Sequence, residues 1–132
     1  MAPHLRTALL VFLACTLMHF VHNAEFLADY PNMPKSVSRG DVYLVWLALA
    51  AAGVTGYLLR VRGHRWGGTA ALVLATVMAL DSLGHYWLAP FSAHTAAMNA
   101  TILADVASAA LLLAVTLSAL RANPNLASRP FE

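Results

Sequence analysis

The chain has 132 residues, of which 60% are hydrophobic and 11% are charged, and its formal net charge is +2. A soluble domain carries about 25% charged residues, so this composition excludes an ordinary soluble protein and indicates an integral membrane protein. The single cysteine, Cys15, excludes an internal disulfide and a cysteine-rich metal site.

Four long apolar stretches use nearly the whole chain. A membrane-spanning helix needs about 20 mostly apolar residues, and we predict spans at 5–27, 42–61, 66–88 and 94–120, followed by a polar tail at 121–132. Short connections make successive helices antiparallel neighbours. The sequence therefore predicts an all-α fold, an integral membrane four-helix up-down bundle that forms one transmembrane domain over residues 1–132.

The positive charges predict the orientation of this bundle. Positive residues collect on the cytoplasmic side of membrane proteins. Six arginines lie before the first span, between the second and third, or after the fourth: Arg6, Arg60, Arg62, Arg65, Arg121 and Arg129. Only Lys35 and Arg39 lie on the other side. We therefore expect both termini in the cytoplasm, in a bilayer such as a bacterial inner membrane. Lipid headgroups explain the basic segment 60–65, and no nucleic-acid partner is expected.

The first span ends in the polar stretch "LMHFVHNAEF", residues 17–26. Residues three and four apart share one face of a helix. One such stripe on this span contains Phe12, Cys15, His19, His22 and Phe26. We expect His19 and His22 to face the interior of the bundle and Glu25 to lie at its rim.

The second span is predicted to be a structural scaffold, because residues 44–59 carry no charged side chain. Ala48, Ala52 and Gly56 fall four residues apart, which places them on one face. Small residues on one face allow neighbouring helices to approach closely.

The third and fourth spans carry further polar stripes. The stripe predicted on the third span consists of Leu74, Met78, Asp81, His85 and Leu88. The stripe on the fourth span consists of His94, Met98, Thr101, Asp105 and Ser108. A charged side chain at the bilayer centre costs about 2.5–3.5 kcal/mol on insertion scales. We therefore expect both stripes to face inward and to have a function.

The depths of three ionisable residues coincide. His22, Asp81 and Asp105 each lie sixteen residues from the arginine at the inner end of their span. At 1.5 Å per residue, each lies about 24 Å from the inner boundary. Because a hydrocarbon core is about 30 Å thick, all three belong to its outer half. The sequence thus predicts one site near the outer face.

A metal-dependent enzyme is the first functional hypothesis for this site. Imidazole and carboxylate ligands suit divalent Zn, Fe or Cu, and a site with few protein ligands keeps positions open for catalysis. The predicted metal ligands are His19, His22, His85, Asp81 and Asp105. The predicted catalytic residues are Asp81, Asp105 and Glu25. Supporting roles are expected for Asn23, His94, Met98 and Thr101.

The substrate and the alternative functions follow from the same residues. With no soluble domain, a small apolar or lipid-like substrate is expected. A metal-free acid–base enzyme, of isomerase or cyclase type acting on an isoprenoid-like substrate, is one alternative. A non-enzymatic subunit of a membrane complex that binds ions or haem is another. Haem is less favoured than a divalent metal, because acidic side chains beside the iron do not suit a simple electron carrier. The bilayer is the expected partner, together with a second copy or a membrane complex.

Overall fold

The structure, a computed structural model, describes residues 2–121. Its helices are α1 (Ala2–Glu25), α2 (Arg39–Val61), α3 (Arg65–Leu80), α4 (His85–Leu88) and α5 (Ala96–Arg121). Three 3-10 turns lie between them: η1 (Leu27–Asp29), η2 (Asp81–Gly84) and η3 (Phe91–Ala93). This part of the chain contains no strand, so the predicted all-α class is confirmed. The predicted polar tail, apart from Arg121, lies outside the described residues.

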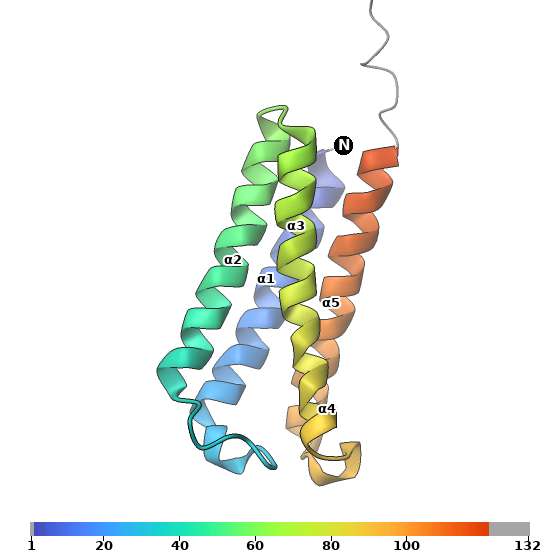
Figure 1. Cartoon of the computed structure of the whole chain (residues 1–132). Coiled ribbons are helices and arrows are strands. Elements are labelled where there is room, and N and C mark those ends of the chain that lie inside the picture. Colours follow the sequence, from blue (N-terminus) through green and yellow to red (C-terminus); the bar gives the residue numbers. More distant parts are fainter. Residues whose placement is uncertain (1, 122–132) are drawn as a thin grey trace, which may run out of the picture.

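The long helices alternate in direction along the chain (Figure 1). Helices α1 and α3 each pack against both α2 and α5, so the four long helices enclose a common interior. The start of α1, the α2–α3 turn and the end of α5 lie together at one end of the bundle. We call the opposite end, which contains residues 26–38 and 81–95, the loop end.

Four helical stretches are long and apolar enough to cross a membrane, as the sequence predicts. They are His4–Glu25, Arg39–Val61, Arg65–Leu88 and Ala96–Arg121, and the third combines α3, η2 and α4. Large apolar side chains such as Leu10, Leu44 and Val77 lie on the outside of the bundle. An apolar outer surface is what contact with lipid tails requires.

Two glycines allow α2 and α3 to pack closely. A Cβ atom added at Gly56 would lie 2.8 Å from the backbone nitrogen of Leu72, and one added at Gly68 would lie 2.7 Å from the carbonyl oxygen of Gly56. The predicted close packing is confirmed at Gly56, which is buried, whereas Ala48 is exposed. The buried face of α2 therefore passes through Leu49 instead.

The stripe predicted on the third span is wrong at three of its five positions. Leu74, Asp81 and Leu88 are exposed, whereas small side chains one position away, including Ala75 and Ser82, are buried. Small side chains allow the closest approach between helices, which favours this face for packing. Side chains three residues apart eclipse one another in a 3-10 turn, so η2 brings Ser82 and His85 to one face, where both are buried.

Candidate functional site

A pocket lies at the loop end of the bundle, between α1, α2 and the η2–α4 segment. Its volume is about 490 Å³, within the usual range of roughly 300–1,000 Å³ for small-molecule sites. Most of its lining is apolar and includes Phe20, Val42, Val45 and Trp87. The polar and charged side chains that line it are His19, Asn23, Asp41, Asp81, Ser82 and His85. Four of the sequence-predicted residues therefore line one cavity: His19, Asn23, Asp81 and His85.

Helix α1 carries His19 and Asn23 into the bundle on one face, because they are four residues apart. His19 is 1% exposed, and its Nδ1 lies 3.4 Å from Oγ1 of Thr101 on α5. The hydroxyl of Thr101 donates to the carbonyl of Met98, so its oxygen accepts from Nδ1–H of His19. The neutral His19 ring then carries its lone pair on Nε2, the nitrogen suited to accept a proton.

His85 joins the same wall of the pocket from α4. The side-chain amide Nδ2 of Asn23 donates to His85 Nε2 over 3.0 Å. The rings of His19 and His85 lie 5.5 Å apart between centroids, close to perpendicular. Asn23 is 6% exposed, and its carbonyl oxygen Oδ1 has no hydrogen-bond partner among residues 2–121. The wall thus contains two adjacent imidazoles and an unused acceptor.

Tyr30 is a site residue that sequence reasoning missed. It lies in the loop after η1, yet only 3% of it is exposed. Its hydroxyl lies 3.0 Å from Nδ1 of His22, and its ring lies 4.8 Å from that of His85. The sequence gives only a weak indication that Tyr30 is buried. It is the one aromatic residue of the 28–41 loop, and Pro31 follows it. His22 is half-buried and does not line the pocket. Its contact with Tyr30 links α1 to the loop that follows η1.

The environment of Tyr30 keeps its hydroxyl protonated. Burial raises the pKa of Tyr30 from its ordinary value of 10.0 to about 12. A hydrogen bond with Thr101 opposes this rise in pKa, whereas the neighbouring Tyr86 adds to it. The protonated phenol and Nδ1 of His22 share a hydrogen bond, in which the donor is set by the tautomer of His22.

A second polar group lies behind Tyr30, where α5 begins. Tyr86 donates its hydroxyl hydrogen to Oδ1 of Asn99 over 2.9 Å. The Nδ1–H group of His94 donates to the carbonyl of Pro90 over 3.1 Å, and its buried Nε2 has no partner among residues 2–121. Neither His94 nor Met98 lines the pocket. Both pack near Tyr30 instead. Met98 belongs to the same buried cluster as Tyr30, and the ring of His94 lies 6.5 Å from that of Tyr30 between centroids.

Asp105 lies behind the pocket and contacts Ser82, which lines it. It is fully buried, and its Oδ2 accepts a hydrogen bond from the Ser82 hydroxyl over 2.5 Å. Its other oxygen, Oδ1, has no partner among the described residues. Ser82 lines the pocket, whereas Asp105 does not. The predicted inward stripe of α5, from His94 to Ser108, is confirmed, since all five of its residues are buried.

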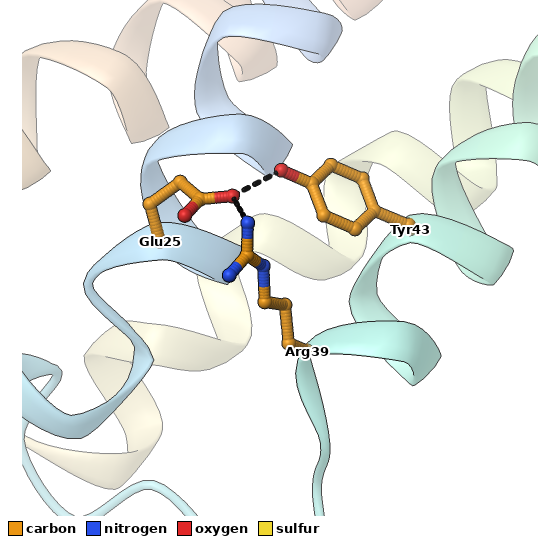
Figure 2. A network of polar contacts seen from close by, with 3 residues as sticks. All are labelled: Glu25, Arg39 and Tyr43. Carbon is orange, nitrogen blue, oxygen red and sulfur yellow. Dashed lines mark hydrogen bonds and ion pairs between the residues drawn. The ribbon is translucent and has the colours of Figure 1, made fainter.

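Glu25 belongs to a contact between α1 and α2 and does not line the pocket. Its carboxylate pairs with the guanidinium of Arg39 and accepts a hydrogen bond from the Tyr43 hydroxyl over 2.6 Å (Figure 2). Arg39 begins α2 beside Ser38, whose side chain caps the helix and accepts a hydrogen bond from the Asp41 backbone N–H. We call the Glu25–Arg39–Tyr43 group the α1–α2 clasp. It joins the two helices at the loop end.

The structure brings some of the predicted metal ligands together and separates others. His19 and His85 are adjacent, His22 faces Tyr30, and Asp105 bonds to Ser82. Among residues 2–121, no three His, Cys, Asp or Glu side chains form a candidate metal site. The divalent metal and the haem therefore remain predictions from the sequence.

No protein-family model matches this chain. No curated protein and no solved structure shows significant similarity to it either. We therefore infer its function from its own residues.

Proposed function

We propose that this protein is a membrane-embedded enzyme that binds a small, mostly apolar or lipid-like molecule in the loop-end pocket and moves a proton at its polar end. The observation that carries the proposal is the pocket itself, which has one wall of histidine, asparagine and aspartate and an otherwise apolar lining. Such a lining suits a molecule with an apolar body and one polar group.

The apolar part of the pocket favours a substrate that arrives from the bilayer. Val45 and Trp87 line the pocket and are 44% and 89% exposed. The mouth therefore lies on the outer surface of the bundle, where lipid tails would be in a membrane. Each methylene group that leaves water for an apolar pocket contributes about 0.8 kcal/mol, so an alkyl or isoprenoid body supplies most of the binding energy.

The polar wall supplies groups for acid–base chemistry. His19 Nε2 is the proposed base, because Thr101 occupies the other ring nitrogen and fixes the tautomer. Asp81 is the proposed group that orients the substrate's polar end, and His85 is the proposed group that returns the proton. An isomerase-type reaction needs only that one proton leaves the substrate and one returns. General acid–base catalysis of this kind contributes roughly 10²–10⁴-fold in rate.

The orientation predicted from the arginines would place this pocket toward the outer face of the membrane. A bacterial inner membrane would then expose the pocket to lipids of its outer leaflet.

A metal-dependent form of the same enzyme is the second candidate, favoured by the adjacent rings of His19 and His85. Two imidazoles would then supply ligands, with substrate or water completing the coordination. Elemental analysis of protein purified without added metal separates the two forms. Stoichiometric Zn, Fe or Cu supports the metal-dependent form, and a Soret band would indicate haem.

The proposal predicts deuterium incorporation from D₂O into a component of a bacterial lipid extract, measured by mass spectrometry. His19→Gln should lower the rate by roughly 10²-fold or more, because glutamine cannot accept the proton. Gly84→Leu should also lower it, since Gly84 lines the pocket and has room for a side chain, with the nearest atom 3.9 Å from an added Cβ.

Gly67→Leu is the matched control for Gly84→Leu. Gly67 is also helical, and an added Cβ lies no closer than 3.8 Å to any atom, but the residue does not line the pocket. The control should keep the wild-type rate. Deuterium incorporation that is equal in all four proteins would contradict the proposal.

A further inference from the structure

The charges that line the pocket are all negative. Asp41 and Asp81 are the two fully charged side chains among its lining residues, which include no lysine or arginine. The nearest arginine of the loop, Arg39, is paired with Glu25 in the α1–α2 clasp. A ligand whose polar end carries a phosphate or a carboxylate would therefore meet repulsion from both aspartates, with no cation in the lining to offset it.

Among the five acidic residues that the structure describes, only Asp81 and the exposed Asp29 have no side-chain hydrogen bond or ion pair, and of these two only Asp81 lines the pocket. Glu25 pairs with Arg39, Asp41 binds Ser38 and Asp105 binds Ser82, whereas no hydrogen bond or ion pair within residues 2–121 holds the Asp81 carboxylate. Asp81 lies in the stretch Arg65–Leu88, which is long and apolar enough to cross a membrane. Asp81 is exposed and lines the pocket, so its carboxylate is available to pair with a bound cation.

A second, independent feature of the pocket wall is the unused acceptor on Asn23. This side chain is 6% exposed and lines the pocket, and its amide nitrogen is already engaged by His85. The remaining oxygen, Oδ1, is buried without a hydrogen-bond partner among the described residues. Buried acceptors in native proteins normally accept a hydrogen bond. We therefore expect a donor on the bound ligand to bond to this oxygen.

We infer that the molecule bound in this pocket is an alkylammonium amphiphile, a protonated amine on an apolar tail, an inference that rests on the proposed function of the pocket. The positive charge pairs with Asp81, and an N–H group donates to Asn23 Oδ1. Trp87, which also lines the pocket, offers an aromatic face that attracts cations. A neutral alcohol would supply the donor but would leave Asp81 without a counter-charge.

The test compares four probes with the same twelve-carbon tail: dodecylamine, dodecanol, dodecanoate and dodecyltrimethylammonium. Their one-to-one binding to the full chain is measured by native mass spectrometry at neutral pH. Wild type should bind dodecylamine about tenfold or more tightly than dodecanol, because only the amine carries a charge that pairs with Asp81. Dodecanoate should bind most weakly. Dodecyltrimethylammonium, which has no N–H group, should bind more weakly than dodecylamine and so report on Asn23.

Asp81→Asn should remove the preference for dodecylamine over dodecanol. Asn is close to Asp in size, so the pocket keeps its shape. Asp29→Asn is the matched control: Asp29 is exposed, lies at the same end of the bundle and does not line the pocket. Any amine that partitions into the detergent affects both variants equally, so it does not alter the comparison between them.

The outcomes separate this inference from the proposed function. If dodecanol binds wild type but not Gly84→Leu, and dodecylamine binds no more tightly than dodecanol, the pocket stands and the cationic ligand is overturned. If no probe binds saturably, both are overturned. Equal loss of amine binding in Asp81→Asn and Asp29→Asn, or tightest binding of dodecanoate, also overturns the cationic ligand.

Discussion

Replacing Tyr30 by phenylalanine tests whether a buried, protonated phenol stabilises the loop after η1, at the loop end of the bundle. The substitution removes the hydroxyl that lies 3.0 Å from Nδ1 of His22. It keeps the ring, which lies 4.8 Å from the ring of His85. The side chain is 3% exposed, so water does not replace the lost hydrogen bond readily. At pH 8 the variant should be less stable by about 1 kcal/mol, the net value of one such bond.

The same substitution should remove a loss of stability at high pH. Burial raises the pKa of Tyr30 from 10.0 to about 12, so the folded state favours the neutral phenol. The resulting stability is fully present below pH 10 and is lost as the pH rises toward 12. Two pKa units correspond to about 2.7 kcal/mol in total, of which about 1.4 kcal/mol is lost by pH 11.

Phenylalanine does not ionise, so Tyr30→Phe should reach or slightly exceed the stability of wild type by pH 11. Equilibrium unfolding in mixed micelles, followed by circular dichroism between pH 8 and pH 11, measures the difference in free energy of unfolding. The two proteins differ only at Tyr30, so contributions from all other groups cancel in this difference. A difference that stays constant over the whole range would refute the assignment of Tyr30 as a buried, protonated phenol.

Two further predictions concern packing and topology. Gly68→Ala should destabilise the bundle by about 1–3 kcal/mol, because its Cβ would lie 2.6–2.8 Å from atoms of α2. Gly67→Ala should be neutral or stabilising in the same unfolding assay, because its Cβ would make only an ordinary contact at 3.8 Å. With Cys15 replaced by serine, a cysteine at Ser36 should react with a membrane-impermeant maleimide added to intact cells, whereas one at His64 should not. Both residues are exposed, at opposite ends of the bundle, and labelling at His64 alone would reverse the predicted orientation.

The sequence by itself determined the class, the number of long apolar helices and the inward face of α5. These are local properties: the length of an apolar run fixes how far a helix extends, and spacing of three and four residues fixes which side chains share a face. Met98, Thr101 and Asp105 followed this rule and are all buried. His19 followed it on α1 as well, because nothing interrupts that helix before Glu25.

Only the tertiary structure decided how the loop end is assembled. The 3-10 turn η2 places Ser82 inside and Asp81 in the pocket, a change of register that helical spacing does not contain. The burial of Tyr30 and the pairing of Glu25 with Arg39 join segments that are separate in the chain. Such contacts depend on how whole helices and loops fit against one another, and no local spacing encodes that fit.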